Sequence, residues 1–349
     1  MRDFKHPLAR LLILGVVLDA GAAPQGPPTL TPRDAALIAE AFHQWNALGP
    51  AVWPGLEAVR APILYITDEH EYFVDFPGPA DSILLDQRIS GRMVYARQRQ
   101  HSRTLSASFD IQGVSVAALG TPEALGKPPE RWVLTALHEM FHVFQHKHGG
   151  PEKIAPLELP PSEERNASWH LNFPFPYANQ DVMNLIHLQA YPLFLAANDA
   201  SIDNRRYNVR VSLEAGAVYQ SVLQSLAGRG DRNYRYSLFQ QWSEGVAFYV
   251  EYRFAKVAAS SAKPTEAFVN RFGSVDYGQV WIENYEQRRF LAKHAGRAAR
   301  SRTAFCHLGF AKALALDSLF PSWKDKYFTP DVWLDQLLEQ GLASGKGTQ

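Results

Sequence analysis

The feature that most constrains the fold is a helix that is apolar on almost every face but carries two histidines and a glutamate. Pro128-Pro129 break the chain before Glu130, and helical spacing then runs to His148, where Gly149-Gly150 end it. Apolar residues occupy the helix almost all round, which is typical of a buried helix: Trp132, Val133, Leu134, Leu137, Met140, Phe141, Val143 and Phe144. Ionisable side chains are costly to bury without a partner, so the sequence predicts a binding site here.

Within the apolar part of this helix lie His138, Glu139 and His142, in an H-E-x-x-H pattern. Successive helical residues turn by about 100°, so the two histidines lie about 40° apart on one face and both imidazoles can reach one cation. Glu139 is turned too far to bind that cation but is near enough to take a proton from a water on it. The pattern predicts one zinc ion with His138 and His142 as ligands and Glu139 as general base.

A third ligand can come from two places. His148 follows His142 by six residues, which is the spacing of the metzincin zinc site. That family has Gly where Gln145 stands, so that the helix breaks, and in an unbroken helix His148 points about 240° round from His142. The second possibility is Glu244, on a later helix. A carboxylate with two imidazoles leaves one position open for water, as in a catalytic site.

A resemblance favours Glu244. The pattern H-E-x-x-H-x-x-Q of residues 138–145, followed by W-x-E-G-x-A-x-Y-x-E in residues 242–251, resembles the gluzincin zinc metallopeptidases. In these enzymes the glutamate of the E-G-x-A helix is the third ligand, and the looser pattern of residues 309–317 is similar to a helix near their C-terminus. The small Gly245 and Ala247 are expected to let this helix approach the first one closely.

The sequence departs from the gluzincin pattern at two points. The gap from His142 to Glu244 is much longer than in thermolysin-like enzymes, and Phe248 stands where several members carry an acidic residue behind a ligand. Glu251, two turns after Glu244, is the alternative for orienting a ligand histidine. A solvated or core-capping role for Glu251 stays open.

A catalytic site of this type also needs a donor for the developing oxyanion, which gluzincins supply with a tyrosine or histidine. The candidates are Tyr249, Tyr252 and His307, and we take Tyr249 and His307 as the predicted catalytic pair beside Glu139. The remaining histidines near the motif are interpreted as surface or loop residues: His146, His148 and His170.

The rest of the chain divides into a β-containing front half and a helical back half. Residues 34–48 have helical spacing, and β-like stretches follow at residues 63–67, 72–74, 93–95 and 114–117. The later helical patterns cover residues 182–197, 207–227, 236–259, 277–300, 304–319 and 331–342. We expect an α+β, predominantly helical, zincin-like fold with a small, mostly antiparallel sheet and the motif helix between the halves. Residues 23–127 form the front lobe, and residues 128–349 form one catalytic unit.

The N-terminus reads as a secretory signal peptide over residues 1–22. Arg2, Lys5 and Arg10 precede an apolar run at residues 11–18 and small residues at 20–23. The run is short of the ~20 residues of a membrane span, so a secreted or periplasmic bacterial protein with no span after cleavage is expected. The 35 basic and 35 acidic side chains balance, which disfavours a nucleic-acid partner.

The expected function is therefore a zinc-dependent metallopeptidase that hydrolyses peptide bonds in a peptide or protein substrate. The edge of the sheet at residues 114–117 is a place where an extended peptide can add as a strand. Two alternatives remain open: a zinc hydrolase of a non-peptide amide or ester, and a non-catalytic binding protein stabilised by zinc. The sequence sets neither the oligomeric state nor the choice between endopeptidase and exopeptidase action.

Overall fold

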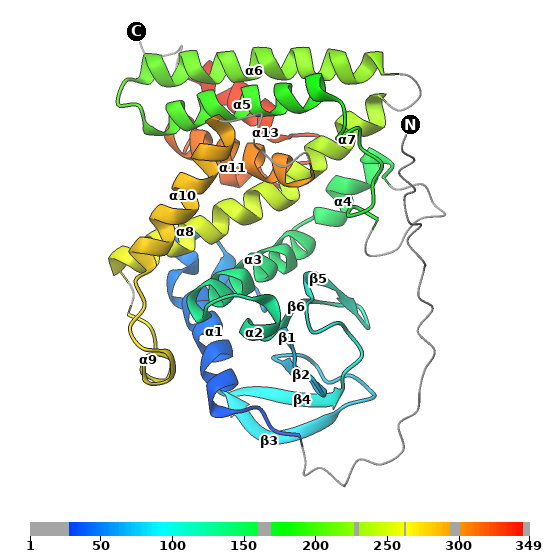
Figure 1. Ribbon diagram of the computed structural model, residues 1–349, viewed down its shortest axis with the longest axis vertical. Helices are drawn as coiled ribbons and strands as arrows, with labels where there is room; N and C mark the ends of the chain where they lie inside the picture. Colours follow the sequence, from blue (N-terminus) through cyan, green and yellow to red (C-terminus); the bar gives the residue numbers. More distant parts are fainter. Residues whose placement is uncertain (1–27, 160–168, 227–229, 262, 294–300, 345–349) are drawn as a thin grey trace, which may run out of the picture.

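A computed structural model describes residues 28–159, 169–226, 230–261, 263–293 and 301–344. The predicted signal peptide lies outside the described residues. Figure 1 shows the strands at one end of the molecule, the later helices at the other and α3 (Pro129–Lys147) between them. The α+β, predominantly helical fold class is confirmed. Within the described ranges, no helix combines the length and apolarity that crossing a membrane would need.

The strands of the described residues form one six-stranded mixed sheet in the order β3-β4-β2-β1-β6-β5. Only β1 and β6 pair in parallel, while the other neighbours are antiparallel. The strands are β1 Ile63–Ile66, β2 His70–Val74, β3 Ile83–Ile89, β4 Arg92–Gln98, β5 Ser106–Ile111 and β6 Val114–Gly120. The mostly antiparallel sheet is thus confirmed, with two strands, β3 and β5, that the pattern did not predict.

The edge strand nearest α3 differs from the prediction. Residues 114–117 belong to β6, which lies between β1 and β5, so they are not an edge. Residues 116–120 are fully buried, as suits an inner strand, whereas β5 is half-buried along most of its length. Among the strands that the structure describes, the edge on this side is therefore β5, which begins with the small residues Ser106, Ala107 and Ser108.

One face of the sheet packs against helices. α1 (Pro32–Val52) begins at Thr31, whose hydroxyl accepts a hydrogen bond from Asp34 N at 3.1 Å. Side chains alternate along the strands, so Ile63 and Tyr65 face the core under α1 and α3, while Leu64 and Ile66 face a second, smaller cluster. The short elements near α3 are η1 Leu56–Ala58, α2 Pro122–Leu125, α4 Gly150–Ile154 and η2 Ala155–Leu157.

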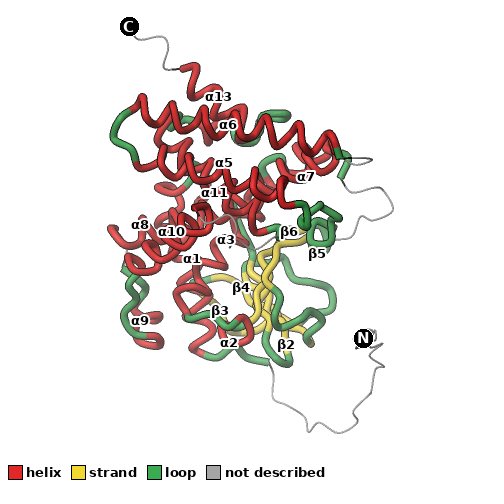
Figure 2. Tube along the Cα trace, turned by 45° about the horizontal axis from the view of Figure 1, so that its top comes forward, coloured by secondary structure: helices red, strands yellow, loops and turns green. Residues whose placement is uncertain are grey.

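The later helices stack in layers on the far side of α3. α5 (Gln180–Asn198) and α6 (Ile202–Ser225) lie side by side as the outermost layer, and α11 (Thr303–Leu319) contacts α5 (Figures 1 and 2). α8 (Val246–Ser261) packs between α11 and α3. The other helices are α7 Gly230–Gln240, η4 Gln241–Gly245, α9 Glu266–Phe272, α10 Tyr277–Lys293, α12 Trp323–Lys326 and α13 Leu334–Ser344.

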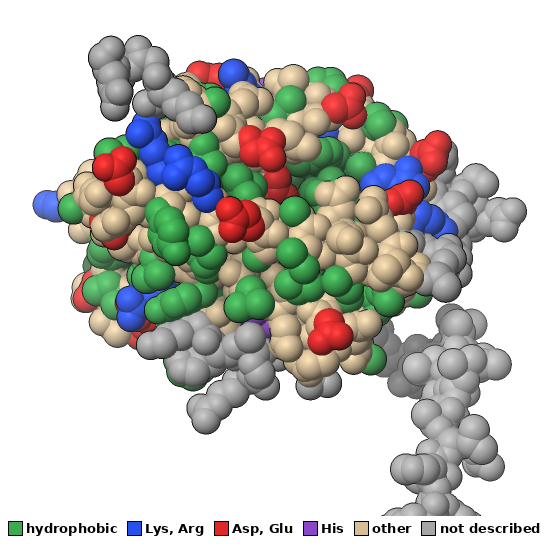
Figure 3. Space-filling view, turned by 90° about the horizontal axis from the view of Figure 1, so that it is seen from above, with side chains coloured by type: hydrophobic (Ala, Val, Ile, Leu, Met, Phe, Trp, Pro, Cys, Tyr) green, Lys and Arg blue, Asp and Glu red, His purple; other side chains and the backbone are tan. Residues whose placement is uncertain are grey.

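The two halves share one hydrophobic core. A single cluster of buried side chains runs from Leu30 through α1, the sheet, α3 and α8 to Leu338 in α13. The expected front lobe and catalytic unit therefore pack through a common interior. On the face over α6, hydrophobic and charged side chains are interspersed, as Figure 3 shows.

Candidate metal centre

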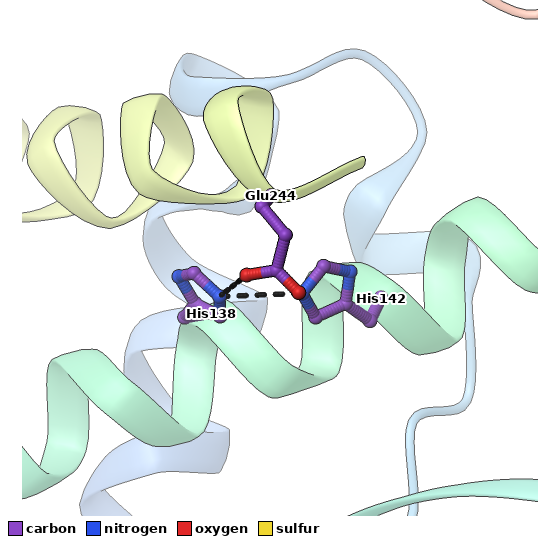
Figure 4. Close-up of side chains that lie close together, drawn as sticks. All are labelled: His138, His142 and Glu244. Atoms are coloured by element: carbon purple, nitrogen blue, oxygen red, sulfur yellow. Dashed lines mark hydrogen bonds and ion pairs between the residues drawn. The ribbon is translucent and has the colours of Figure 1, made fainter. Parts of the chain in front are cut away.

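Three predicted ligands come together on the inner faces of α3 and η4 (Figure 4). His138 Nε2 and His142 Nε2 are 3.2 Å apart. Glu244 Oε2 lies 3.8 Å from the first nitrogen, and Glu244 Oε1 lies 3.9 Å from the second. One ligand atom from each residue falls within 4.8 Å of the others, so the group can hold a metal ion. Among the described residues this is the one such group.

Glu244 reaches the histidines from a π-helical turn. The sequence predicts one continuous helix over residues 236–259, but η4 (Gln241–Gly245) interrupts it directly at the ligand. Single π-turns within α-helices often mark functional sites. The turn widens the helix, so its position decides where the Glu244 carboxylate points.

The π-turn lies against a glycine of α11. A Cβ on Gly245 would be 2.5 Å from Gly309 Cα, and a Cβ on Gly309 would be 2.2 Å from Gln241 O. The tightest contact of Gly245 is thus with α11, while the expected approach of this segment to α3 is seen at Glu244, which reaches both histidines. The Lys312 side chain, 1% exposed, adds a hydrogen bond from Nζ to Gln241 Oε1 at 2.7 Å. Contacts from α11 thus hold the turn that carries Glu244.

His142 is oriented by Gln145, one turn along α3. Gln145 Oε1 is 2.7 Å from His142 Nδ1, so that ring nitrogen donates and Nε2 keeps its lone pair for a metal. The amide nitrogen of Gln145 donates to Ser243 O at 3.2 Å and to the Tyr327 hydroxyl at 2.7 Å. One buried side chain therefore links a ligand histidine to the backbone just before Glu244.

His138 has a carboxylate behind it. Glu251 Oε2 lies 3.6 Å from His138 Nδ1, which supports the orienting role that the sequence left open. The Phe248 ring packs edge-on against the His138 imidazole, with centroids 4.6 Å apart. Burial lowers the pKa of His138, but Glu244 and Glu251 outweigh it and raise the pKa to about 9. A metal cation bound here would therefore compete with protons for the same nitrogens.

Glu139 faces the same space without joining the ligands. Its Oε1 accepts a hydrogen bond of 2.9 Å from the hydroxyl of Ser106 on β5. The residue is 6% exposed and lines a cavity of about 620 Å³ together with all three ligands. The edge strand β5, α3, η4 with α8, and the segment at His170 form the walls of this cavity.

The structure does not bring the predicted oxyanion donors to the cavity. The Tyr249 hydroxyl donates to Asp317 Oδ2 at 2.5 Å, and burial, with this carboxylate, raises the pKa of Tyr249. His307 Nδ1 lies 3.3 Å from Arg288 Nη1, and burial lowers the pKa of His307 to about 3. Neither residue, nor Tyr252, lines the cavity. Each points from its helix toward a neighbouring helix of the core.

Two other side chains that can donate hydrogen bonds line the cavity instead. Arg302 Nη1 lies 3.0 Å from Glu244 Oε1, and His170, interpreted from the sequence as a loop residue, lines the cavity. Burial lowers the pKa of His170 to about 4, so its ring is neutral at pH 7 and can donate a hydrogen bond. No spacing in the sequence connects either residue to the motif helix.

His146 and His148 stay outside the metal group. His146 Nδ1 is 3.5 Å from Asp110 Oδ1 at the end of β5. The His148 ring stacks on Phe144 and its Nδ1 lies 3.0 Å from Phe144 O, at the C-terminal end of α3. The metzincin alternative for the third ligand is thus not the arrangement found.

Comparisons with protein-family models, with curated proteins and with solved structures give no match. The functional argument therefore depends on the geometry of this site. Two imidazoles and a carboxylate converge at the wall of a cavity, and a further carboxylate, Glu139, faces that cavity and accepts a hydrogen bond from Ser106.

Proposed function

We propose that this protein is a zinc-dependent metallopeptidase of the gluzincin type, with a zincin-like fold. The observation that supports it most is the convergence of His138, His142 and Glu244, whose ligand atoms lie within 4.8 Å of one another. Three protein ligands leave a fourth position free, which is typical of catalytic rather than structural zinc. A separate carboxylate in the same cavity has no use in a purely structural site.

The ligand set fits zinc. Nitrogen from imidazole together with a carboxylate oxygen suits this metal, and both Nδ1 atoms face partners on the outer side of the rings. The Nε2 atoms are thereby left toward each other and toward Glu244. When bound, zinc supplies Lewis acidity to a water molecule and to the substrate carbonyl.

The chain's own residues supply the proton transfers. Glu139, held by Ser106, accepts a proton from the attacking water and passes it to the leaving amine. A C–O bond forms and the C–N bond breaks, giving a carboxylic acid and an amine. Arg302 and His170 line the cavity and are the available donors for the developing oxyanion.

The free edge of β5 supports a peptide as substrate. Residues 106–109 of β5 line the cavity, and an extended peptide can add to this edge as a further strand. Such a segment presents its own amide bonds in line with the metal group. With the signal-peptide pattern of residues 1–22, we place this activity outside the cytoplasm.

The test combines metal analysis with turnover. The mature protein is expected to contain one zinc ion and to cleave members of a peptide library, with small esters and amides assayed beside them. Glu139→Gln should keep the zinc and lose about 10²–10⁴-fold in turnover, while Glu152→Gln, at an exposed position of α4, should change neither.

Each contrary outcome has its own meaning. Unchanged turnover in Glu139→Gln removes this residue from catalysis. Cleavage of esters without peptides favours the non-peptide hydrolase, and bound zinc without any turnover favours the binding protein.

A further inference from the structure

The edge strand β5 runs in the same direction as α3. Near its start, the Ser106 hydroxyl contacts Glu139 at 2.9 Å, and near its end Asp110 Oδ1 lies 3.5 Å from His146 Nδ1. A peptide that adds to β5 in the antiparallel sense, the slightly more stable pairing, must run the opposite way along α3. Its carboxyl end then points toward the beginning of this helix.

A lysine lies where that carboxyl end arrives. Lys127, two residues before α3, lines the cavity, and its Nζ donates to Thr135 Oγ1 at 2.6 Å. The Thr135 hydroxyl gives its own proton to Arg131 O at 2.8 Å, so its oxygen is fixed as an acceptor. Two further N–H groups of the Lys127 ammonium remain for a ligand.

The ammonium has no acidic partner at close range. Within the described ranges, no carboxylate oxygen is within the 4.0 Å of an ion pair with Lys127. Glu251, the carboxylate on this side of the cavity, contacts His138 at 3.6 Å and Asn284 at 3.5 Å instead. A cation held in place by Thr135, with Glu251 near it but beyond ion-pair distance, favours an anionic group of the substrate.

The spacing of Thr135 and Glu139 along α3 limits the distance between the anionic group of the substrate and the bond that is cleaved. Thr135 precedes Glu139 by four residues, about 6 Å of helix, and an extended peptide advances about 3.3 Å per residue. We propose that Lys127, positioned by Thr135, binds the C-terminal carboxylate of the substrate, so that the protein is an exopeptidase releasing one or two residues. This inference rests on the peptidase function proposed above.

The carboxylate site is tested by binding, without turnover. Zinc-loaded Glu139→Gln protein is titrated calorimetrically with an acetylated tetra-alanine peptide that ends in a free carboxylate, and with the same peptide as its C-terminal amide. The acid should bind about tenfold or more tightly than the amide. Adding Lys127→Met should remove this difference, Lys127→Arg should keep most of it, and Lys263→Met, at an exposed position before α9, should keep all of it.

Equal binding of acid and amide overturns the carboxylate site, and so does a difference that survives Lys127→Met, because the zinc alone would then be recognising the acid. Thr135→Val offers a second variant that loosens Lys127 without removing it, and it should reduce the difference.

Mass spectrometry of products from the wild-type protein then separates the two proposals. Release of one or two C-terminal residues supports exopeptidase action, and cleavage only at internal bonds overturns it while leaving a peptidase. A Lys127-dependent preference for the acid with no cleavage of any peptide keeps the carboxylate site and overturns the peptidase function.

Discussion

The two ligand histidines use their second ring nitrogens differently. His142 is bonded at 2.7 Å to a neutral amide, whereas His138 lies 3.6 Å from a carboxylate. The amide of Gln145 also bonds the backbone that leads into Glu244, so it sets the distance between two ligands as well as one ring orientation. Gln145 therefore fixes the candidate ligand group more strongly than its neutral side chain indicates.

Replacing Gln145 by Leu should weaken zinc binding about 10–100-fold, because His142 loses the partner that fixes its tautomer and ring position. The dissociation constant is measured by competition with a chromophoric chelator. Gln189→Leu, at another buried glutamine whose amide bonds Leu185 O within α5, is the control for the loss of a buried hydrogen bond. Equal zinc affinity in the two variants would contradict the positioning role.

The buried carboxyl group of Glu71 should make the stability of the folded protein depend on pH. Burial raises the pKa of this carboxyl, but the backbone N–H groups of Gln100 and His101 and the Arg97 guanidinium outweigh it and hold the pKa below 4.5. Because the folded pKa lies below the unfolded one, the stabilisation is full above about pH 4.5 and is lost as pH falls through the folded value. Glu71 is linked to the cavity through His101, which lines it.

Glu71→Gln should therefore lower the free energy of unfolding at pH 7 by roughly 1–3 kcal/mol and flatten its fall in acid. Urea titrations between pH 3 and pH 7 measure both effects. Glu57→Gln, at an exposed position in η1, should follow the wild-type curve. A Glu71 variant with the wild-type slope in acid would disprove the assignment.

Residue spacing predicted the parts of the site that lie on one helix. The i, i+4 relation places His138 and His142 on one face with Glu139 beside them, and the family pattern added Glu244. Tyr249 was not predicted correctly, because its direction depends on how α8 is rotated against α11. Arg302 and His170 lie on other segments, and no local pattern connects them to α3.

Among the elements, the π-turn and the edge strand β5 were not predicted from the sequence, and the reasons are related. The apolar period of residues 236–259 is that of a plain helix, and the extra residue of η4 is stabilised by tertiary contacts with Gly309 and Lys312. β5 begins with the small residues Ser106, Ala107 and Ser108, and its pairing with β6 is what makes it a strand. Both elements border the cavity, whereas the ends of α1, α3, α5 and α11 lie within four residues of their predicted positions. α6 begins five residues earlier than predicted, and the predicted end of the helix at residues 277–300 lies outside the described residues.

Gly309→Ala tests the coupling between α11 and the π-turn. The added Cβ would meet Gln241 O at 2.2 Å and Gly245 Cα at 2.8 Å, both backbone atoms, so the helices must separate. We expect a loss of roughly 1–3 kcal/mol in stability and a weaker zinc affinity, because Glu244 moves with the turn. Gly216→Ala in α6 meets only the end of the Gln189 side chain, at 3.2 Å, and should leave zinc affinity unchanged. If Gly309→Ala and Gly216→Ala bind zinc with similar affinity, the position of the π-turn does not control the metal site.

For the whole molecule, the metal group lies where the two halves of the chain meet. His138 and His142 belong to α3, which packs on the sheet, and Glu244 belongs to the helices that follow about a hundred residues later. A zinc ion bound by all three joins these regions in the folded state, and the unfolded chain does not hold the ligands together. Zinc binding should therefore stabilise the whole fold, because one core spans both halves.

Zinc at about 1,000 times its dissociation constant adds about 4 kcal/mol to stability, so removing it with a chelator should lower Tm by several degrees. The effect should shrink as the pH falls, because protons displace zinc from the histidines and His138, with a pKa of about 9, competes even near neutrality. Thermal unfolding followed by circular dichroism, with zinc or with chelator, measures the shift.

Glu244→Gln should abolish most of this Tm shift and Glu152→Gln none of it, because only Glu244 supplies a ligand oxygen from the second half of the chain. If the chelator leaves the Tm of the wild-type protein unchanged, zinc does not bridge these helices.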